Sequence, residues 1–230
     1  MLSQRDRTGD SDLQSILKKW LKDRYNKPGE VFLGLVQRLD RPTRGLLVLA
    51  RTSKAASRLS EQIRVRKFHK EYLAVVTGKK VKTGEMVHYL EKDANLKKAV
   101  VADPDKAPGT AGPDAASNRL DDKAKAARMR LEHLETSGAL SLVRIVLETG
   151  RFHQIRVQLA AEGTPIAGDR KYGTSSDRTG KQTRQLALMC SNIAFEHPTR
   201  RETMRYSIAL PDEYPWNQFR QPQDTALPVP

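Results

Sequence analysis

Three segments of the sequence combine polar side chains with flanking apolar residues in a way that ordinary packing does not require. They read "QRLDRPTRG" (residues 37–45), "FHKEYLAVVTG" (68–78) and "ETGRFHQIRVQLAAEGTPIAGDRKYG" (148–173). Asp40 supplies a carboxylate that can attack an electrophile or stabilise positive charge, and Tyr72 supplies an aromatic face and a hydroxyl. Arg156 supplies a cation that can keep a nearby carboxylate ionised. Residue type alone leaves open whether any of the three acts in catalysis.

Each candidate also has an ordinary structural explanation. An aspartate in a turn before a strand often hydrogen-bonds the backbone, and by itself Asp40 favours that interpretation. A tyrosine of a core strand would explain Tyr72, and a solvent-exposed helix residue would explain Arg156. The neighbouring sequence has to decide between these alternatives.

Three segments show the apolar spacing of amphipathic helices. The first begins after Ser11, its predicted N-cap, and ends by Gly29. The second is capped by Ser53 and has a basic outer surface. The third follows Gly150 and is predicted to stop at Gly163.

Strand patterns occur between and after these helices. The apolar run "GLLVLA" at 45–50 is predicted to be a central strand buried on both faces. Further strands are predicted at 70–78, 86–92, 140–150, 192–197 and 203–210. Because the strands and helices do not alternate regularly, we expect an α+β fold with a mixed, mostly antiparallel central sheet flanked by helices.

The length of 230 residues suits a single domain, which we place at residues 1–215. Residues 102–122 are rich in Pro, Gly, Ala, Asp and Ser, which predicts a surface insertion. Residues 216–230 are predicted to form a loose, Pro-rich tail.

The charge balance predicts a polyanionic partner. Lys and Arg number 41 against 27 Asp and Glu, for a net charge of +14, and the excess is spread along the chain. Charge alone leaves RNA, DNA and anionic membrane open. The chain has no apolar run near the roughly 20 residues that span a bilayer. With one cysteine and no signal-peptide pattern, we expect a cytoplasmic protein without disulfides.

The three segments together resemble the RluA-type RNA pseudouridine synthases. That family has a H-R-L-D-x-x-T-S-G segment, then K-x-Y, then G-R-x-H-Q-I-R-V followed by P-I-x-G-D-x-x-Y-G. The resemblance runs from about residue 9 to residue 210. It implies the pseudouridine synthase fold and isomerisation of uridine in rRNA or tRNA. It also implies that no cofactor is needed, and the five histidines lack the spacing of metal ligands.

The resemblance also implies roles for individual residues. Asp40 takes the place of the catalytic aspartate near the ribose C1′ of the target uridine, and Arg156 pairs with it. Tyr72 lies against the target base, where it can stack and take part in proton transfer. Arg38 fills the space left by the flipped uridine. Further substrate-binding residues are predicted to be Arg44, Lys70 and Arg151.

The sequence departs from the family pattern at several places. Gln37 stands where the first segment usually has His, Arg44 where it has Ser, and Phe152 where the third segment has Thr. The family pattern also has an additional strand and a K-P-x-G loop before the region that matches residues 1–10, and neither these nor an S4-type RNA-binding domain are found in this sequence. These differences bear on substrate choice and on the extent of activity.

Two other functions compete with catalysis. One is a catalytically weak or inactive RNA-binding or ribosome-associated paralogue, against which the retained Asp40, Tyr72 and Arg156 argue. The other is DNA binding, which only the charge supports. We expect a monomer that binds RNA, with no membrane and no small-molecule cofactor.

Overall fold

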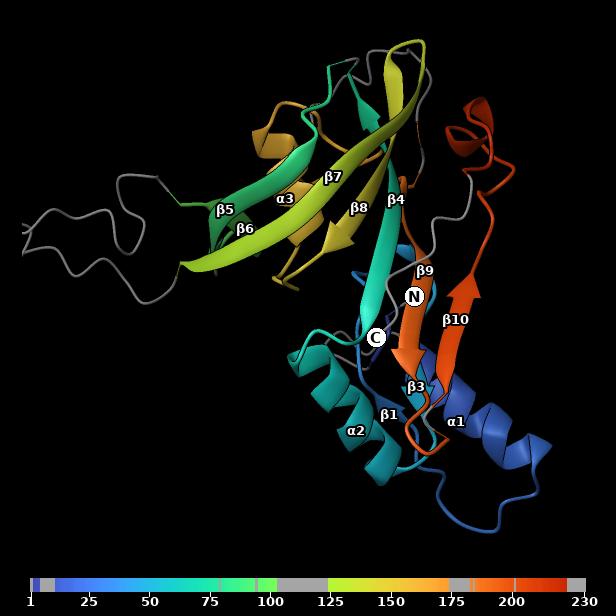
Figure 1. Cartoon of the computed structure of the whole chain (residues 1–230). Coiled ribbons are helices and arrows are strands. Elements are labelled where there is room, and N and C mark those ends of the chain that lie inside the picture. The colour runs from blue at the N-terminus through green and yellow to red at the C-terminus, as the bar shows by residue number, and fades with distance from the viewer. Residues whose placement is uncertain are drawn as a thin grey trace, which may run out of the picture. The chain divides into compact units, whose positions relative to one another are not determined.

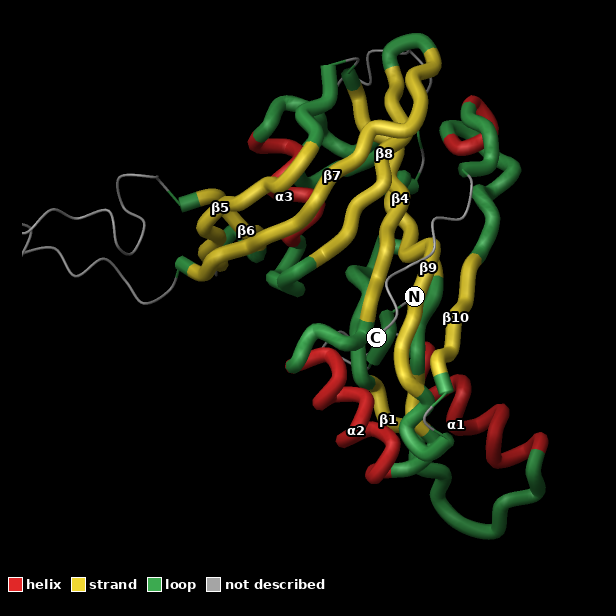
Figure 2. Tube along the Cα trace, viewed as in Figure 1, coloured by secondary structure: helices red, strands yellow, loops and turns green. Residues whose placement is uncertain are grey.

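A computed structural model of the chain describes residues 2–4, 11–78, 80–93, 95–102, 124–173, 183, 185–200 and 202–222 (Figure 1). These residues form two compact units. The first contains the described residues up to Glu71 together with Met189–Ala209, and the second contains those of Tyr72–Leu188 and Leu210–Pro222. Helices and mostly antiparallel strands occur together, which confirms the predicted α+β class (Figure 2). The single-domain boundaries stay a prediction, and residues 103–122 of the predicted insertion lie outside the described residues.

The first unit carries two of the predicted helices, α1 (Leu13–Arg24) and α2 (Ser53–Arg64). Both begin as expected, but the predicted caps are wrong by one residue. Asp12 caps α1, because its carboxylate accepts a hydrogen bond from Ser15 N at 2.9 Å. Thr52 caps α2 by accepting from Ala55 N at 3.1 Å. In each helix the cap is the residue with extended backbone next to the first helical turn.

The strands of the first unit are short. They are β1 (Gly34–Leu35), β2 (Arg44–Gly45), β3 (Leu49–Ala50) and β10 (Thr203–Ser207), with most of β9 (Leu188–Glu196). β1 pairs with β3 and β10 pairs with β9, both antiparallel, whereas β2 pairs with β9 in parallel.

The predicted central strand at 45–50 is wrong. The segment belongs to two separate strands, because β2 pairs with β9 while β3 pairs with β1. Gly45 lies at the change of partner with φ +120°, and a Cβ at this position would clash with the backbone of Cys190. Of the six residues only Ala50 is buried. The apolar run therefore contains parts of two short, partly exposed strands rather than one strand covered on both faces.

The second unit is built on long antiparallel strands. β4 (His69–Thr77) leads from the first unit into the second, and β5 (Gly84–Asp93), β6 (Lys98–Val101), β7 (Lys125–Ser137) and β8 (Leu140–Leu147) follow. β5 pairs with both β6 and β7, and β7 pairs with β8. The predicted strands near 70–78, 86–92 and 140–150 are confirmed, whereas β6 and β7 were not predicted.

The third helix, α3 (Gln154–Ala161), packs against β5 and β6 (Figure 1). Its residues Gln154–Leu159 are all buried. Val157 joins Leu90, Ala99 and Ala127 in a core cluster between the helix and the strands. The helix ends two residues before Gly163, close to the predicted stop. Burial therefore restricts the orientation of the side chains from Gln154 to Leu159.

The chain after residue 215 is packed where the structure describes it. Trp216 is 1% exposed and Phe219 is 9% exposed. The backbone N–H of Arg220 donates to Glu135 Oε2 at 3.0 Å. The predicted loose tail is therefore wrong for residues 216–222, because two aromatic side chains anchor it, and residues 223–230 lie outside the described residues.

Candidate active site

Asp40 lies in the first unit, in the loop between β1 and β2. Its backbone carbonyl accepts a hydrogen bond from Thr43 N at 2.8 Å, which closes a tight turn. On the other side, Ser3 Oγ donates to Leu39 O at 3.2 Å and accepts from Leu39 N at 3.4 Å. The half-buried Asp40 therefore stands on a loop whose backbone is fixed before and after it.

Three predicted substrate-binding cations share this unit with Asp40. Arg38 is exposed, and Arg44 is half-buried at the start of β2, where it pairs with Met189 of β9. Lys70 on β4 is half-buried, and burial lowers its pKa, while the neighbouring Cys190 thiol acts in the opposite direction. A partly desolvated ammonium group gains more from an anionic partner than a fully hydrated one does.

The other predicted site residues belong to the second unit. Tyr72 on β4 is only 7% exposed, and the following residues from Leu73 to Val76 are buried as well. Arg151 is exposed and its Nε donates to Ala126 O at 3.0 Å. Arg156 is buried on α3. The predicted pairing of Arg156 with Asp40 joins residues of different units and stays a prediction.

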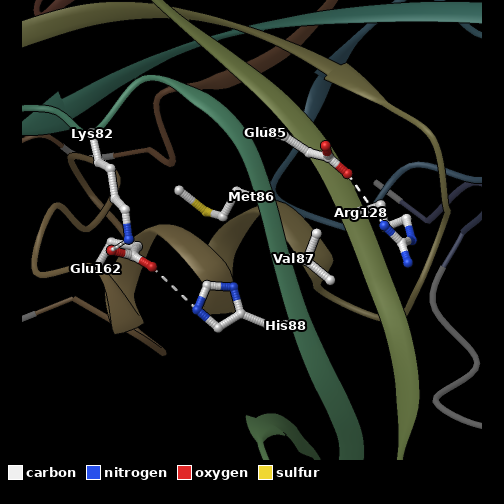
Figure 3. A pocket seen from close by; sticks show the side chains of 7 residues that line it. All are labelled: Lys82, Glu85, Met86, Val87, His88, Arg128 and Glu162. Atoms are coloured by element: carbon white, nitrogen blue, oxygen red, sulfur yellow. Dashed lines mark hydrogen bonds and ion pairs between the residues drawn. The ribbon is translucent and has the colours of Figure 1, made fainter.

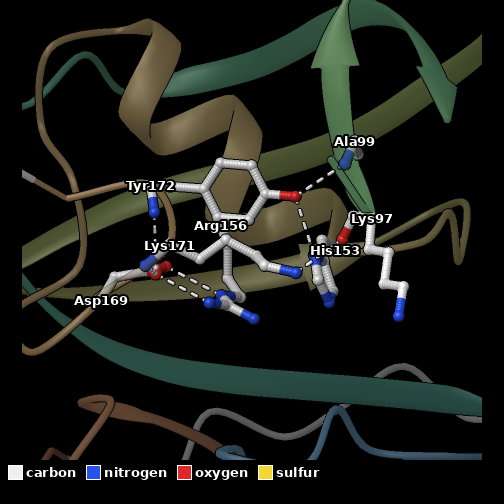
Figure 4. A network of polar contacts seen from close by, with 7 residues as sticks. All are labelled: Lys97, Ala99, His153, Arg156, Asp169, Lys171 and Tyr172. Atoms are coloured by element: carbon white, nitrogen blue, oxygen red, sulfur yellow. Dashed lines mark hydrogen bonds and ion pairs between the residues drawn. The ribbon is translucent and has the colours of Figure 1, made fainter. Parts of the chain in front are cut away.

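Within the second unit, the guanidinium group of Arg156 is held by Asp169 (Figure 4). Arg156 Nε donates to Asp169 Oδ2 at 2.8 Å, and Nη2 donates to Oδ1 at 2.7 Å, in a two-point contact. The two side chains are 6% and 0% exposed. Asp169 was not predicted as this partner, because the P-I-x-G-D segment that contains it does not show which side chain it contacts.

Asp169 is kept ionised despite its burial. Burial raises the pKa of the Asp169 carboxyl, but the hydrogen bond and charge of Arg156 outweigh this effect and lower it overall. The backbone N–H groups of Lys171 and Tyr172 also donate to Oδ1, at 2.9 and 3.1 Å. Next to it Gly168 has φ +75°, and a Cβ there would clash with the carbonyl of Gln185. The loop after α3 is thus shaped to present one carboxylate to Arg156.

Tyr172 links this ion pair to His153 (Figure 4). Its ring lies 5.1 Å from the Arg156 guanidinium carbon. Its hydroxyl oxygen accepts from Ala99 N at 2.8 Å and lies 2.7 Å from His153 Nδ1. Burial first, then the charges of Arg156 and Lys171, lower the pKa of His153 to about 4. At neutral pH His153 is therefore uncharged, and the Tyr172 hydroxyl can donate to Nδ1.

A pocket on the surface of the second unit lies among charged residues that pair with one another (Figure 3). Lys82 Nζ lies 3.2 Å from Glu162 Oε2, and His88 Nε2 lies 3.2 Å from Glu162 Oε1. Arg128 and Glu85 form a further pair at 3.2 Å. The pocket is lined by Lys82, Glu85, Met86, Val87, His88, Arg128 and Glu162, and none of the predicted site residues is among them.

Two further properties concern possible cofactors and membranes. Among the described residues, no cluster of three or more His, Cys, Asp or Glu side chains has an arrangement that could hold a metal ion. In the same part of the chain, no helix has both the length and the apolar character needed to cross a bilayer.

Comparison with known sequences shows similarity to enzymes that modify RNA. The sequence model of the RNA pseudouridylate synthase family matches residues 1–161. The chain is 34% identical over 200 residues to an uncharacterized RNA pseudouridine synthase of Chloroflexus aurantiacus, covering 86% of this chain and 56% of that protein. It is 34% identical over 189 residues to ribosomal large subunit pseudouridine synthase C of Haemophilus influenzae, covering 80% and 53%. The chain thus spans about half the length of the curated relatives it matches.

Solved structures show the same fold. The human protein RNA pseudouridylate synthase domain containing 4 aligns with a TM-score of 0.71 and 21% identity, over 92% of this chain and 82% of its own. Human RNA pseudouridylate synthase domain containing 1 aligns with a TM-score of 0.59 and 23% identity, over 89% and 81%. At these identities the alignments show similarity of the fold alone.

Proposed function

Because this chain belongs to the RNA pseudouridylate synthase family, we propose that it isomerises uridine in structured RNA, either rRNA or tRNA, to pseudouridine. Membership confirms the resemblance seen in the sequence. The observation that carries the proposal is the segment around Asp40, which resembles the family's first motif and lies within the 161 residues that the family model matches. The relative from Haemophilus influenzae is named for the ribosomal large subunit, which favours rRNA within this class of substrates.

The proposed reaction needs one carboxylate and no external reactant. Asp40 attacks or stabilises the ribose C1′ while the N1–C1′ bond breaks. The freed uracil turns and C5 bonds to C1′, while any bond from Asp40 to C1′ breaks and its electron pair returns to the carboxylate. The proton on C5 is lost and N1 gains one. Atoms and electrons balance within the nucleotide, so no redox cofactor and no phosphate donor takes part.

Other residues would position the substrate for this step. Arg156, oriented by Asp169, would keep Asp40 ionised, and Tyr72 would lie against the target base. Arg38 would fill the gap left by the flipped uridine and so offset part of the unstacking energy. Three more cations, namely Arg44, Lys70 and Arg151, would contact phosphates.

The proposal is tested by release of tritium from RNA that carries [5-³H]uridine. We expect release by the wild-type protein and none by Asp40→Asn, on either rRNA or tRNA transcripts. If neither this chain nor a version extended upstream releases tritium, catalysis is excluded. RNA binding that persists in that case would establish the alternative, a catalytically inactive RNA-binding paralogue.

The proposal includes a cytoplasmic location, where rRNA and tRNA of bacteria are found, and a monomeric state. A mass near 25.9 kDa in light scattering would support the monomer. A mass of twice that value would contradict it.

A further inference from the structure

Phe152 is an exposed aromatic residue beside the buried Arg156 network. It precedes His153, which has left-handed backbone with φ 54° and is the N-cap residue of α3. The Phe152 side chain is 44% exposed. Its ring stacks on the His153 ring, with centroids 3.8 Å apart and planes inclined by 21°. Because so much of the ring meets solvent, packing into a core does not account for it.

The ring that supports Phe152 is held in place. His153 Nδ1 lies 2.7 Å from the Tyr172 hydroxyl, and the two rings meet edge to face at 5.5 Å. The Tyr172 hydroxyl is fixed in turn by Ala99 N on β6 at 2.8 Å. The low pKa of His153, about 4, keeps this ring neutral at physiological pH. Phe152 is therefore backed by an aromatic group in one defined orientation.

Ammonium groups from three segments lie around these rings. Lys92 Nζ of β5 lies 5.2 Å from the Phe152 ring centroid, and Lys98 Nζ of β6 lies 5.9 Å from that of Tyr172. Lys171 Nζ is directed by a hydrogen bond of 2.6 Å to the carbonyl of Lys97. Lys92 is exposed, so its flexible side chain can turn from the ring to a neighbouring phosphate. Proteins bind unpaired nucleotides with exposed aromatic rings, on which the bases stack, and with nearby cations that contact the phosphates.

We propose that Phe152 is a stacking platform for an unpaired base of the RNA substrate, with Lys92 and Lys98 on the adjoining phosphates. The inference rests on the proposed function for RNA as the ligand and adds a substrate-binding residue to it. Phe152 stands where the family pattern has Thr, so the platform would give this chain an RNA contact that depends on its own sequence. Stacking tolerates any base, so Phe152 would add affinity rather than read sequence.

RNA binding by Phe152 variants tests the platform. Binding is measured by fluorescence anisotropy with a labelled RNA, in the Asp40→Asn background so that no product forms. Loss of base stacking corresponds to roughly 1–2 kcal/mol, or about 5- to 30-fold. We expect Phe152→Leu to raise the Kd by that factor and Phe152→Tyr to change it less than about twofold.

The matched control is Phe32→Leu, which alters another exposed phenylalanine, 47% exposed, in the first unit. It should leave the Kd unchanged. Equal affinity of Phe152→Leu and wild type, or equal loss in Phe152→Leu and Phe152→Tyr, would overturn the platform. Thermal unfolding of each variant separates a lost contact from a lost fold, because a stacking role leaves the melting temperature unchanged.

Photocrosslinking gives an independent reading of the same contact. RNA that carries 5-iodouridine should crosslink to Phe152, as mapped by mass spectrometry, and a crosslink confined to other residues would refute the inference. The platform and the proposed catalysis can fail separately. If RNA binding depends on Phe152 but the protein releases no tritium, catalysis alone is excluded. If the protein releases tritium and Phe152→Leu changes neither this release nor the Kd, the platform alone is excluded.

Discussion

At the scale of single residues, Arg156 and Asp169 form a buried ion pair in the second unit. Both side chains are at least 94% buried, and two short hydrogen bonds join them. A buried charge without its partner is strongly destabilising, whereas the intact pair adds little stability of its own. Its value therefore lies in orientation, because Asp169 fixes where the guanidinium group of Arg156 points.

We predict that Asp169→Asn lowers the free energy of unfolding by about 3–5 kcal/mol, since it leaves the Arg156 charge buried and uncompensated. Urea denaturation measures this change. The control is Glu61→Gln, which breaks an exposed ion pair with Arg64. The Arg64 side chain is 76% exposed and the Glu61 side chain is 49% exposed. That variant should lose less than about 1 kcal/mol. Equal losses in the two variants would show that the Arg156–Asp169 pair is not buried as described.

His153 gives the fold a dependence on pH. Its pKa is 6.5 when unfolded and about 4 when folded, so between these values the unfolded chain binds one more proton. The contribution of uncharged His153 to the free energy of unfolding is therefore fully present above about pH 6.5 and decreases as the pH falls toward 4. We predict that the melting temperature of His153→Gln falls less steeply than that of the wild type across this window. Parallel curves for the two proteins would contradict the lowered pKa.

At the scale of elements, the first turn of α1 depends on Asp12. Its carboxylate accepts from Ser15 N at 2.9 Å and from Ser15 Oγ at 2.7 Å, and the residue is 3% exposed. We predict that Asp12→Ala costs about 1–2 kcal/mol in urea denaturation, the range of strong helix caps. Ser11→Ala, which alters the exposed neighbour, should cost less than about 0.5 kcal/mol. The reverse order would restore Ser11 as the cap.

The helices and several strands with regular patterns could be predicted from the sequence, whereas the two-residue strands β1, β2 and β3 could not. Apolar and branched residues predicted β4 and β8, and periodicity predicted all three helices to within a few residues. The prediction of one central strand at 45–50 was wrong, because the apolar pattern does not show that Gly45 lies against the Cys190 backbone. β7 alternates exposed charges such as Arg128 and Arg130 with buried Ala127 and Met129, which was a strand signal not used.

For the candidate site too, some features could be proposed from the sequence and others could not. Asp40, Tyr72 and Arg156 could be proposed from the sequence because they stand in short segments that resemble a family pattern, and their roles stay predictions. The partner of Arg156 within the second unit could not, since Asp169 reaches it through a loop whose shape depends on backbone contacts. The support of Phe152 by His153 also needed three-dimensional information, because adjacent residues stack only when the backbone turns as it does at His153.

At the scale of the whole molecule, the net charge of +14 should govern how the protein meets RNA. Each phosphate that a Lys or Arg neutralises releases counterions, so affinity falls as salt rises. We predict that the logarithm of the association constant for RNA decreases steeply and linearly with the logarithm of KCl concentration. Anisotropy titrations from low to physiological salt measure the slope. A flat profile would rule out backbone contacts as a main source of binding.

The same titrations separate RNA from DNA as the ligand. With single-stranded RNA and DNA of one sequence at matched salt, the proposed function predicts tighter binding to RNA. Equal affinity at every salt concentration would favour binding through charge alone.

The central claim, that Asp40 carries out the isomerisation of uridine, is tested most directly by single-turnover rates with saturating protein. We predict that Asp40→Asn lowers the rate of tritium release from [5-³H]uridine RNA by about 10³-fold or more, as loss of a catalytic nucleophile does. The Kd for RNA should stay within about threefold of the wild-type value, because the neutral amide keeps the shape of the loop. A rate within about tenfold of the wild type, at unchanged affinity, would contradict the role of Asp40.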